Sequence, residues 1–228
     1  MESNTQDEGQ VLLINKPLKW TSFDVVYKVR KKLKIRKIGH AGTLDPLATG
    51  LLIICVGKKT KQIESFVGLD KEYTGTFVLG QTTPSFDLET EVSNQKDISG
   101  LTTEAIYSVA KSLTGKISQL PPMHSAVKVG GRRAYKFARR GKEVALSPRE
   151  VEVKEFEITS ICLPEINFRI VCSKGTYIRS IARDLGECLG VGAYLSELCR
   201  TRIGEYKLEN AISTDEVIPP EHANLPRP

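Results

Sequence analysis

The chain has 228 residues, of which 40% are hydrophobic and 26% charged, with a net charge of +6, which is typical of a globular protein with a full core. Its longest apolar run, residues 51–56, is far shorter than the roughly 20 residues that cross a bilayer, and the polar, acidic N-terminus is no signal peptide. These features exclude a helical membrane protein and predict a cytoplasmic one.

The first elements are a short strand and an amphipathic helix. Residues 1–9 are polar and are expected to form a disordered tail, and the apolar residues that follow predict a strand over 10–17. Thr21 or Ser22 is suited to cap a helix that ends near residue 33. The buried face of this helix is expected to carry Phe23, Val26, Val29 and Leu33.

A glycine-punctuated loop follows, and it carries the best candidate for chemistry. Asp45 precedes Pro46, which disfavours helical geometry and presents the carboxylate from a turn or an extended segment. Gly42 and Gly50 bracket Asp45 and allow close approach of a ligand, and His40 lies on the same loop. A carboxylate held there can act as a base or a nucleophile. An Asp-Pro pair is also a common start of an ordinary turn, so both interpretations stay open.

The second half of the chain mixes strands and helices without regular alternation. A polar connection is expected at residues 81–91 and an irregular basic excursion around residues 120–145. Strands are predicted at 51–56, 71–80, 149–159 and 165–173, and helices up to about 67, at 103–114 and at 173–190. This irregular order favours the α+β class, and without repeats or an internal linker it predicts one compact domain.

The basic residues are concentrated in two segments. Residues 28–37 carry seven basic residues, and residues 128–142 carry seven more, interleaved with Tyr135 and Phe137. Such clusters bind phosphates by counterion release, and the aromatic residues can stack on bases. Each segment alone also fits a solvated surface or an acidic protein partner. Two segments far apart in the sequence favour a polyanion such as a nucleic acid.

A second clue is an arginine near the start of a predicted helix. If Ser173 or Thr176 caps this helix, Arg179 lies in the first turn, where the helix dipole disfavours a cation. We place it on the flank of the buried face that Ile178 and Ile181 define. An arginine there indicates a nearby carboxylate or phosphate, although a plain surface arginine is an equally good interpretation.

The cysteines and histidines form no metal-binding pattern. The five cysteines make no CxxC pair, and the three histidines occur without an HExxH motif. Cys55, Cys162 and Cys172 lie in apolar stretches, as expected of core residues in a reducing compartment. We therefore expect no metal.

One long block resembles a known catalytic motif. Residues 39–61 read GHAGTLDPLATGLLIICVGKKTK, which resembles the catalytic motif of the TruB pseudouridine synthases, in its bacterial rather than its guide-RNA-dependent version. Five further blocks of that family follow the family's order: LLINKPLKWTS, KEYTGTFVLG, PPMHSAVKVGGRRAYKFARRG, CSKGTYIRSIARDLG and AYLSELCRTRIG. The resemblance implies a pseudouridine synthase fold, with a mixed, mainly antiparallel central sheet flanked by helices and a basic insertion.

The resemblance also assigns roles to particular residues. Asp45 matches the essential aspartate that breaks the C1′–N1 glycosidic bond of uridine, so that the uracil rotates and rejoins through C5. Tyr73 matches the tyrosine that stacks on the base, and Arg179 the arginine that pairs with the aspartate. The nucleotide and its pocket would be held or supported by Lys16, His40, Tyr177 and Leu198. The basic insertion, residues 120–145, would contact tRNA through Lys128, Arg132, Arg133, Lys136, Arg139 and Arg140.

The same resemblance implies the overall organisation and the partner. The catalytic domain is expected over residues 10–212, with a tail at 213–228 and no C-terminal PUA domain. The substrate would be the T-arm of tRNA, with uridine 55 of the T-loop as the target. No cofactor is expected, because an isomerisation needs no redox change, and no guide RNA or obligate protein partner is expected. His124 departs from the family's usual tyrosine in the PPMYSA segment, so the contact made there is open.

Two functions of other classes fit parts of the pattern. A non-catalytic RNA-binding or RNA-folding protein would bind tRNA without forming product and would tolerate the loss of Asp45. A glycosidase-like or nuclease enzyme would need a second positioned carboxylate or a metal cluster, and the sequence indicates neither. The complete set of Asp45, Tyr73 and Arg179 favours the synthase.

Overall fold

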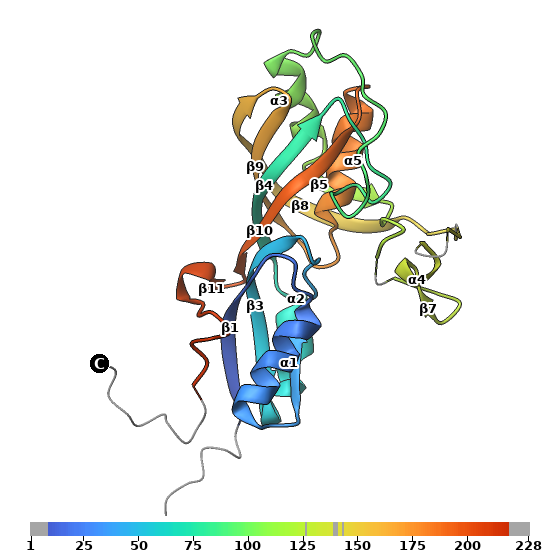
Figure 1. Cartoon of the computed structure of the whole chain (residues 1–228). Coiled ribbons are helices and arrows are strands. Elements are labelled where there is room, and N and C mark those ends of the chain that lie inside the picture. The colour runs from blue at the N-terminus through green and yellow to red at the C-terminus, as the bar shows by residue number, and fades with distance from the viewer. Residues whose placement is uncertain (1–8, 126, 139–140, 143, 219–228) are drawn as a thin grey trace, which may run out of the picture. The chain divides into compact units, whose positions relative to one another are not determined.

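The computed structural model describes residues 9–125, 127–138, 141–142 and 144–218, and Figure 1 shows their elements. The chain divides into two compact units, one made of residues 1–73 and 199–228 and the other of residues 74–198. Two strands, β4 (Lys71–Leu79) and β10 (Ala193–Ile203), contribute residues to both units. No helix in the described ranges is long and apolar enough to cross a membrane.

The first unit is built on a strand that is buried on both faces. Strand β3 (Ala48–Val56) pairs antiparallel with β1 (Gln10–Lys16) and β2 (Ile38–Ala41). Leu52 and Ile54 of β3 pack with α1, while Leu51 and Ile53 pack on the other face with Phe66 of α2. Covering both faces explains the uninterrupted apolar run of this strand. The remaining elements of this unit are α1 (Ser22–Leu33), η1 (Gly57–Gln62), α2 (Ile63–Gly68), β11 (Tyr206–Lys207) and η2 (Leu208–Asn210).

Helix α1 begins where the sequence indicates, but its buried face is rotated from the predicted one. Thr21 is the N-cap, and with Asp24 it forms a capping box, in which each side chain accepts a hydrogen bond from the other's backbone N–H. The core contains Val25 together with Val26, Val29 and Leu33. The prediction that Phe23 is buried is wrong, since 63% of its surface is exposed.

In the second unit, neighbouring strands of the sheet follow the order β10-β4-β9-β8-β5. Strands β8 and β9 pair antiparallel, as do β5 and β8, and Phe77 of β4 stacks on Phe168 of β9 with ring centroids 4.0 Å apart. Helix α3 contacts both β8 and α5. The elements of this unit not yet given are α3 (Thr103–Ser112), β5 (Gly115–Gln119), β6 (Lys128–Val129), β7 (Arg132–Arg133), α4 (Tyr135–Ala138), β8 (Arg149–Cys162), β9 (Glu165–Cys172) and α5 (Ile178–Cys188).

The α+β class and the mainly antiparallel pairing are confirmed. The basic excursion is less irregular than expected, because β6 and β7 form a small antiparallel hairpin that α4 follows. Strands β2, β5 and β10 were not predicted. Strands β2 and β5 are short, with four and five residues, whereas β10 has 11 residues and was noted only as a block of the family resemblance. The helix predicted over 173–190 begins only at Ile178, where Tyr177 is the N-cap and makes no side-chain capping hydrogen bond.

Candidate functional site

The loop between β2 and β3 carries Asp45, and α1 fixes its position from one side. The hydroxyl of Ser22, in the first turn of α1, accepts a hydrogen bond from the N–H of Leu44 (2.9 Å) and lies 3.2 Å from its carbonyl oxygen, to which it donates. On the other side of Asp45, the carbonyl of Pro46 accepts from the N–H of Lys19 at 2.8 Å. The residues before and after Asp45 are therefore hydrogen-bonded to the first residue of α1 and to the segment just before this helix.

A buried cation lies close to this loop. Lys16, at the end of β1, is fully buried, and its ammonium donates to the carbonyls of Pro17 (2.9 Å), Trp20 (2.6 Å) and Pro46 (3.3 Å). Burial lowers the pKa of Lys16 to about 8, and the negative charge of Asp45 opposes this shift. The sequence-based prediction gave Lys16 a supporting role in the site, and these contacts are consistent with that role.

Arg200 was not predicted from the sequence, yet it is hydrogen-bonded to the chain on both sides of Asp45, at Gly42 in the loop and at Leu51 within β3. Its side chain is 1% exposed, and it donates to the carbonyl of Leu51 from Nε (2.8 Å) and to that of Gly42 from Nη2 (3.2 Å). Gly50 has a φ of 102°, and a Cβ there would lie 2.4 Å from the carbonyl oxygen of Arg200. Strand β10 thus packs against the start of β3 too closely for any side chain at this position.

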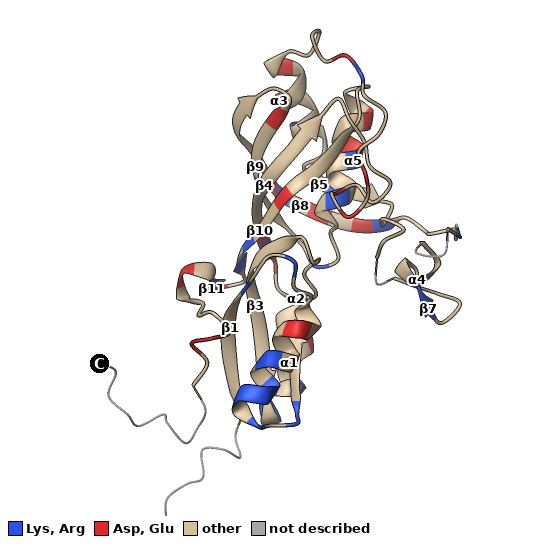
Figure 2. Ribbon diagram, viewed as in Figure 1, with Lys and Arg blue, Asp and Glu red and all other residues tan. Residues whose placement is uncertain are grey.

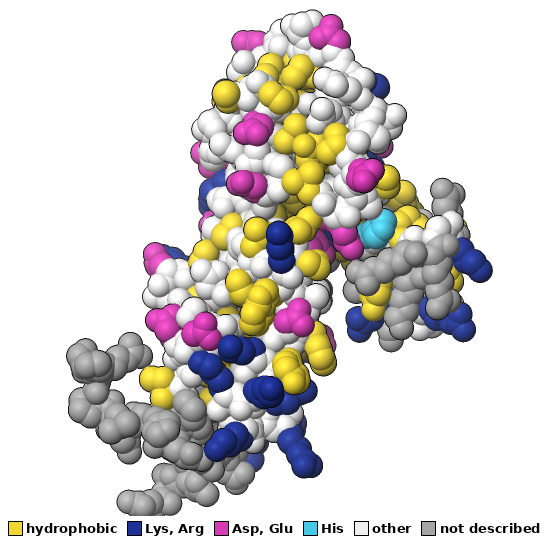
Figure 3. All heavy atoms as spheres, in the orientation of Figure 1, with side chains coloured by type: hydrophobic (Ala, Val, Ile, Leu, Met, Phe, Trp, Pro, Cys, Tyr) yellow, Lys and Arg dark blue, Asp and Glu magenta, His cyan; other side chains and the backbone are white. Residues whose placement is uncertain are grey.

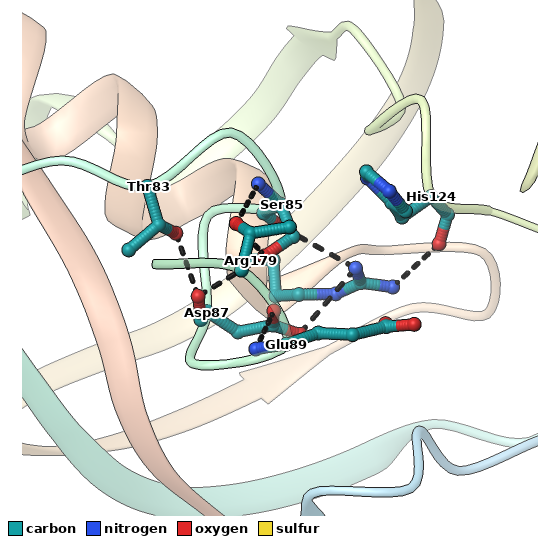
Figure 4. Close-up of polar contacts among 7 residues, drawn as sticks. Thr83, Ser85, Asp87, Glu89, His124 and Arg179 are labelled. Atoms are coloured by element: carbon teal, nitrogen blue, oxygen red, sulfur yellow. Dashed lines mark hydrogen bonds and ion pairs between the residues drawn. The ribbon is translucent and has the colours of Figure 1, made fainter. Parts of the chain in front are cut away.

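Arg179 lies in the second unit and is buried, so its interpretation as a surface arginine is wrong. Nη1 lies 3.5 Å from Oδ2 of Asp87 and 3.4 Å from the carbonyl oxygen of Ser85, and Nη2 donates to the carbonyl of His124 at 3.0 Å (Figure 4). The side chains of Arg179 and Asp87 are 3% and 6% exposed. The anion expected near this arginine is therefore present, in a residue that the sequence did not single out. The predicted pairing of Arg179 with Asp45 stays a prediction.

Asp87 is itself held firmly, in a tight turn that Figure 4 shows around it. Its Oδ1 accepts from the N–H of Glu89 at 2.9 Å. Its backbone carbonyl accepts from the hydroxyls of Thr83 (2.6 Å) and Ser85 (3.0 Å). The sequence does not indicate that Asp87 is buried. The groups that bind it belong to the same polar connection and meet it only when this connection folds.

The start of α5 is also attached to the segment after β5. The side-chain amide of Gln119 donates to the carbonyl of Tyr177 (3.1 Å) and accepts from its N–H (2.8 Å), and the hydroxyl of Ser180 donates to the carbonyl of Leu120 (2.8 Å). Together with the His124 carbonyl bound by Arg179, these bonds fix the segment from residue 119 to residue 124. The backbone of His124 makes this contact, so the departure at this position leaves it intact.

The other predicted site residues occupy varied positions. Tyr73 is 9% exposed and lies in the first unit, where His40 of β2 is half-buried. Leu198 of β10 is half-buried in the second unit. Arg132 and Arg133 are exposed on β7, and Lys128 and Lys136 belong to β6 and α4. Arg139 and Arg140 lie outside the described residues. Among the described residues no cluster of His, Cys, Asp and Glu could hold a metal.

Comparison with known proteins identifies the family. Residues 30–178 match the N-terminal domain of the TruB family pseudouridylate synthases, and residues 179–219 match the tRNA pseudouridylate synthase B C-terminal domain. The chain belongs to the TruB family. A tRNA pseudouridine synthase B of Flavobacterium johnsoniae is 53% identical over 90% of this chain and 93% of its own length. That of Parabacteroides distasonis is 51% identical over 92% of both chains.

The fold of this TruB chain is also found among solved structures. The crystal structure of a Cbf5-Nop10-Gar1 complex contains a chain that matches 91% of this one, with a TM-score of 0.69 and 32% sequence identity. The match covers 53% of that chain, so the TruB chain corresponds to about half of its length. The predicted pseudouridine synthase fold is confirmed.

The first prediction concerns the charge interaction between Lys16 and Asp45. In an Asp45→Asn variant the attraction that favours the ammonium is lost, so the pKa of Lys16 should fall below about 8. It can be measured by NMR titration of protein containing isotopically labelled lysine. Asp97→Asn, which removes an exposed carboxylate in the other unit, is the control and should leave Lys16 unchanged. An equal pKa in both variants would show that Lys16 and Asp45 do not interact.

The second prediction concerns the buried pair of Arg179 and Asp87. Arg179→Ala should lower the free energy of unfolding by about 3–5 kcal/mol, because it strands a buried carboxylate. Adding Asp87→Ala should restore part of that loss, giving a coupling energy of about 1 kcal/mol or more in a double-mutant cycle measured by urea unfolding. Additive losses would mean that the two side chains contribute independently.

Proposed function

We propose that the protein is a tRNA pseudouridine synthase that converts uridine 55 of the T-loop to pseudouridine, with Asp45 as the catalytic carboxylate. The observation that carries the proposal is the fixed position of the Asp45 loop, near a buried ammonium and between two carbonyls, of Gly42 and Leu51, that Arg200 binds. Membership of the TruB family supports the reaction, and the tRNA pseudouridine synthase B relatives support the substrate.

The reaction is an isomerisation in which the atoms of the nucleotide are conserved. The C1′–N1 bond breaks, the uracil rotates, a C5–C1′ bond forms, C5 loses its proton and N1 gains one. The carboxylate of Asp45 either attacks C1′ or assists elimination, and both routes require it to be ionised. The ammonium of Lys16 favours that form, because the attraction between the two charges stabilises both.

The substrate base must leave the folded T-loop to reach this carboxylate. Extruding a nucleotide costs a few kcal/mol, which stacking and hydrogen bonds in the enzyme must offset. We assign the stacking to Tyr73, and the holding of the extruded nucleotide to His40, Tyr177 and Leu198. We also propose that Arg179, in addition to its contact with Asp87, pairs with Asp45 when the site is assembled.

The basic insertion, residues 120–145, is proposed to contact phosphates of the T-arm. The hairpin of β6 and β7 presents Arg132 and Arg133 to solvent, where cations are available to a polyanion. We propose that four further basic residues of this segment contribute to the contact: Lys128, Lys136, Arg139 and Arg140. The enzyme would act in the cytoplasm on tRNA alone, without a guide RNA or an obligate protein partner, and residues 10–212 would form its catalytic domain.

The third prediction tests this function with an unmodified tRNA transcript. The wild-type protein should form pseudouridine at position 55, detected by site-specific mapping, and should form none when that uridine is replaced by cytidine. Asp45→Asn keeps the shape of the side chain but removes its charge, so turnover should fall by about a thousandfold or more while tRNA affinity stays within about twofold. Asp97→Asn, a carboxylate on an exposed loop, should keep full turnover.

Two results would contradict the proposal. Binding of tRNA by the wild-type protein without any pseudouridine would indicate a non-catalytic RNA-binding protein. Turnover of Asp45→Asn within about tenfold of wild type would remove Asp45 from the central role.

A further inference from the structure

The exposed face of α1 combines aromatic and basic side chains that the site described above does not use. Phe23, Tyr27 and Lys31 follow one another at intervals of four residues and therefore lie on one side of the helix. Phe23 and Tyr27 are 63% and 52% exposed, and Nζ of Lys31 lies 5.6 Å from the centre of the Tyr27 ring. We use the name α1 face for Phe23, Tyr27 and the basic residues of the segment 28–37, to which Lys31 belongs.

The basic part of the α1 face is strongly cationic. Residues 28–37 contain seven basic residues and no acidic one. Figure 2 shows them gathered at the C-terminal half of α1 and in the turn after it, and Figure 3 shows basic side chains at the surface there. Asp215 pairs with this segment, 3.3 Å from Lys28 and 3.9 Å from Lys32. Lys31, Arg36 and Lys37 are exposed and make no ion pair with the described part of the chain.

The α1 face begins beside the loop of Asp45. The helix is joined to this loop by the two hydrogen bonds between Ser22 and Leu44, which belong to the same unit. Its 12 residues, at about 1.5 Å each, extend about 18 Å from there. The aromatic residues thus lie in the half nearer to Asp45, and the cations follow from Lys28 onward, with Lys31 beside the Tyr27 ring.

We propose that the α1 face is a second tRNA-binding surface, in which Phe23 and Tyr27 stack on unpaired bases near the target uridine and Lys31, Arg36 and Lys37 contact phosphates further along the RNA. This inference rests on the proposed function and names a binding surface for its substrate. The occupant follows from charge complementarity, because a dense cationic segment without acidic residues suits a phosphate backbone. The adjoining exposed aromatic rings provide the stacking platform typical of sites for unpaired bases.

The fourth prediction tests the cations of this face. Lys31→Gln with Arg36→Gln should weaken tRNA binding about tenfold at moderate salt and reduce the slope of log affinity against log salt by about 1.4 to 1.8, because two phosphate contacts are lost. The matched control is Lys111→Gln with Lys116→Gln, which removes the same charge from exposed positions on α3 and β5. The control should bind like wild type and keep wild-type turnover.

A variant of the aromatic residues gives an independent measurement. Phe23→Ala with Tyr27→Ala should weaken tRNA binding by about fivefold or more without changing the salt slope, because stacking releases no counterions. Since both side chains are exposed, the variant should unfold at nearly the wild-type temperature. Wild-type affinity and salt slope in the Lys31 and Arg36 variant, or equal losses in it and its control, would overturn the inference. A wild-type protein that binds no tRNA would instead overturn the proposed function.

Discussion

The hydrogen bonds of the buried Lys16 ammonium are the constraint on which the Asp45 loop depends. A buried ammonium is stable only if hydrogen bonds replace its water, and here the carbonyls of Pro17, Trp20 and Pro46 do so. One of these carbonyls belongs to the residue next to Asp45, so moving the loop would leave the cation without part of its hydrogen bonding. Arg200 constrains the same loop and the strand after it through the carbonyls of Gly42 and Leu51. The carboxylate therefore sits on backbone that two buried cations hold in place.

Each unit of the chain arranges its own part of the predicted catalytic set. The loop of Asp45 is fixed within the first unit, because its residues Leu44, Pro46 and Gly42 are hydrogen-bonded to α1, β1 and β10. Arg179 is fixed within the second unit by Asp87 and by two backbone carbonyls. Charged groups with these fixed partners need little reorganisation when a substrate arrives, and such preorganisation is the main source of electrostatic catalysis.

Helix α1 shows how one short element serves the core and the surface at once. Its inner side packs Val25, Val26, Val29 and Leu33 into the core of the first unit. Its first turn holds the loop of Asp45 through Ser22, and its outer side carries the cations and exposed rings of the α1 face. Because the packed valines determine the orientation of the helix, they also determine which side chains face solvent.

Local sequence alone predicted the elements that depend on neighbouring residues. The Thr21 cap of α1, strands β1 and β4 and the α+β class follow from capping and periodicity, and Asp45 stands out because Pro46 and two glycines surround it. Tertiary structure decided that Val25 is buried and Phe23 is exposed. Both residues border the apolar side of α1, and only the packing of the helix against the sheet determines which of them is covered. Tertiary structure also decided the burial of Arg200 and the pairing of Arg179 with Asp87. A charged side chain appears exposed in sequence, since the distant carbonyls and carboxylates that make its burial possible meet it only in the fold.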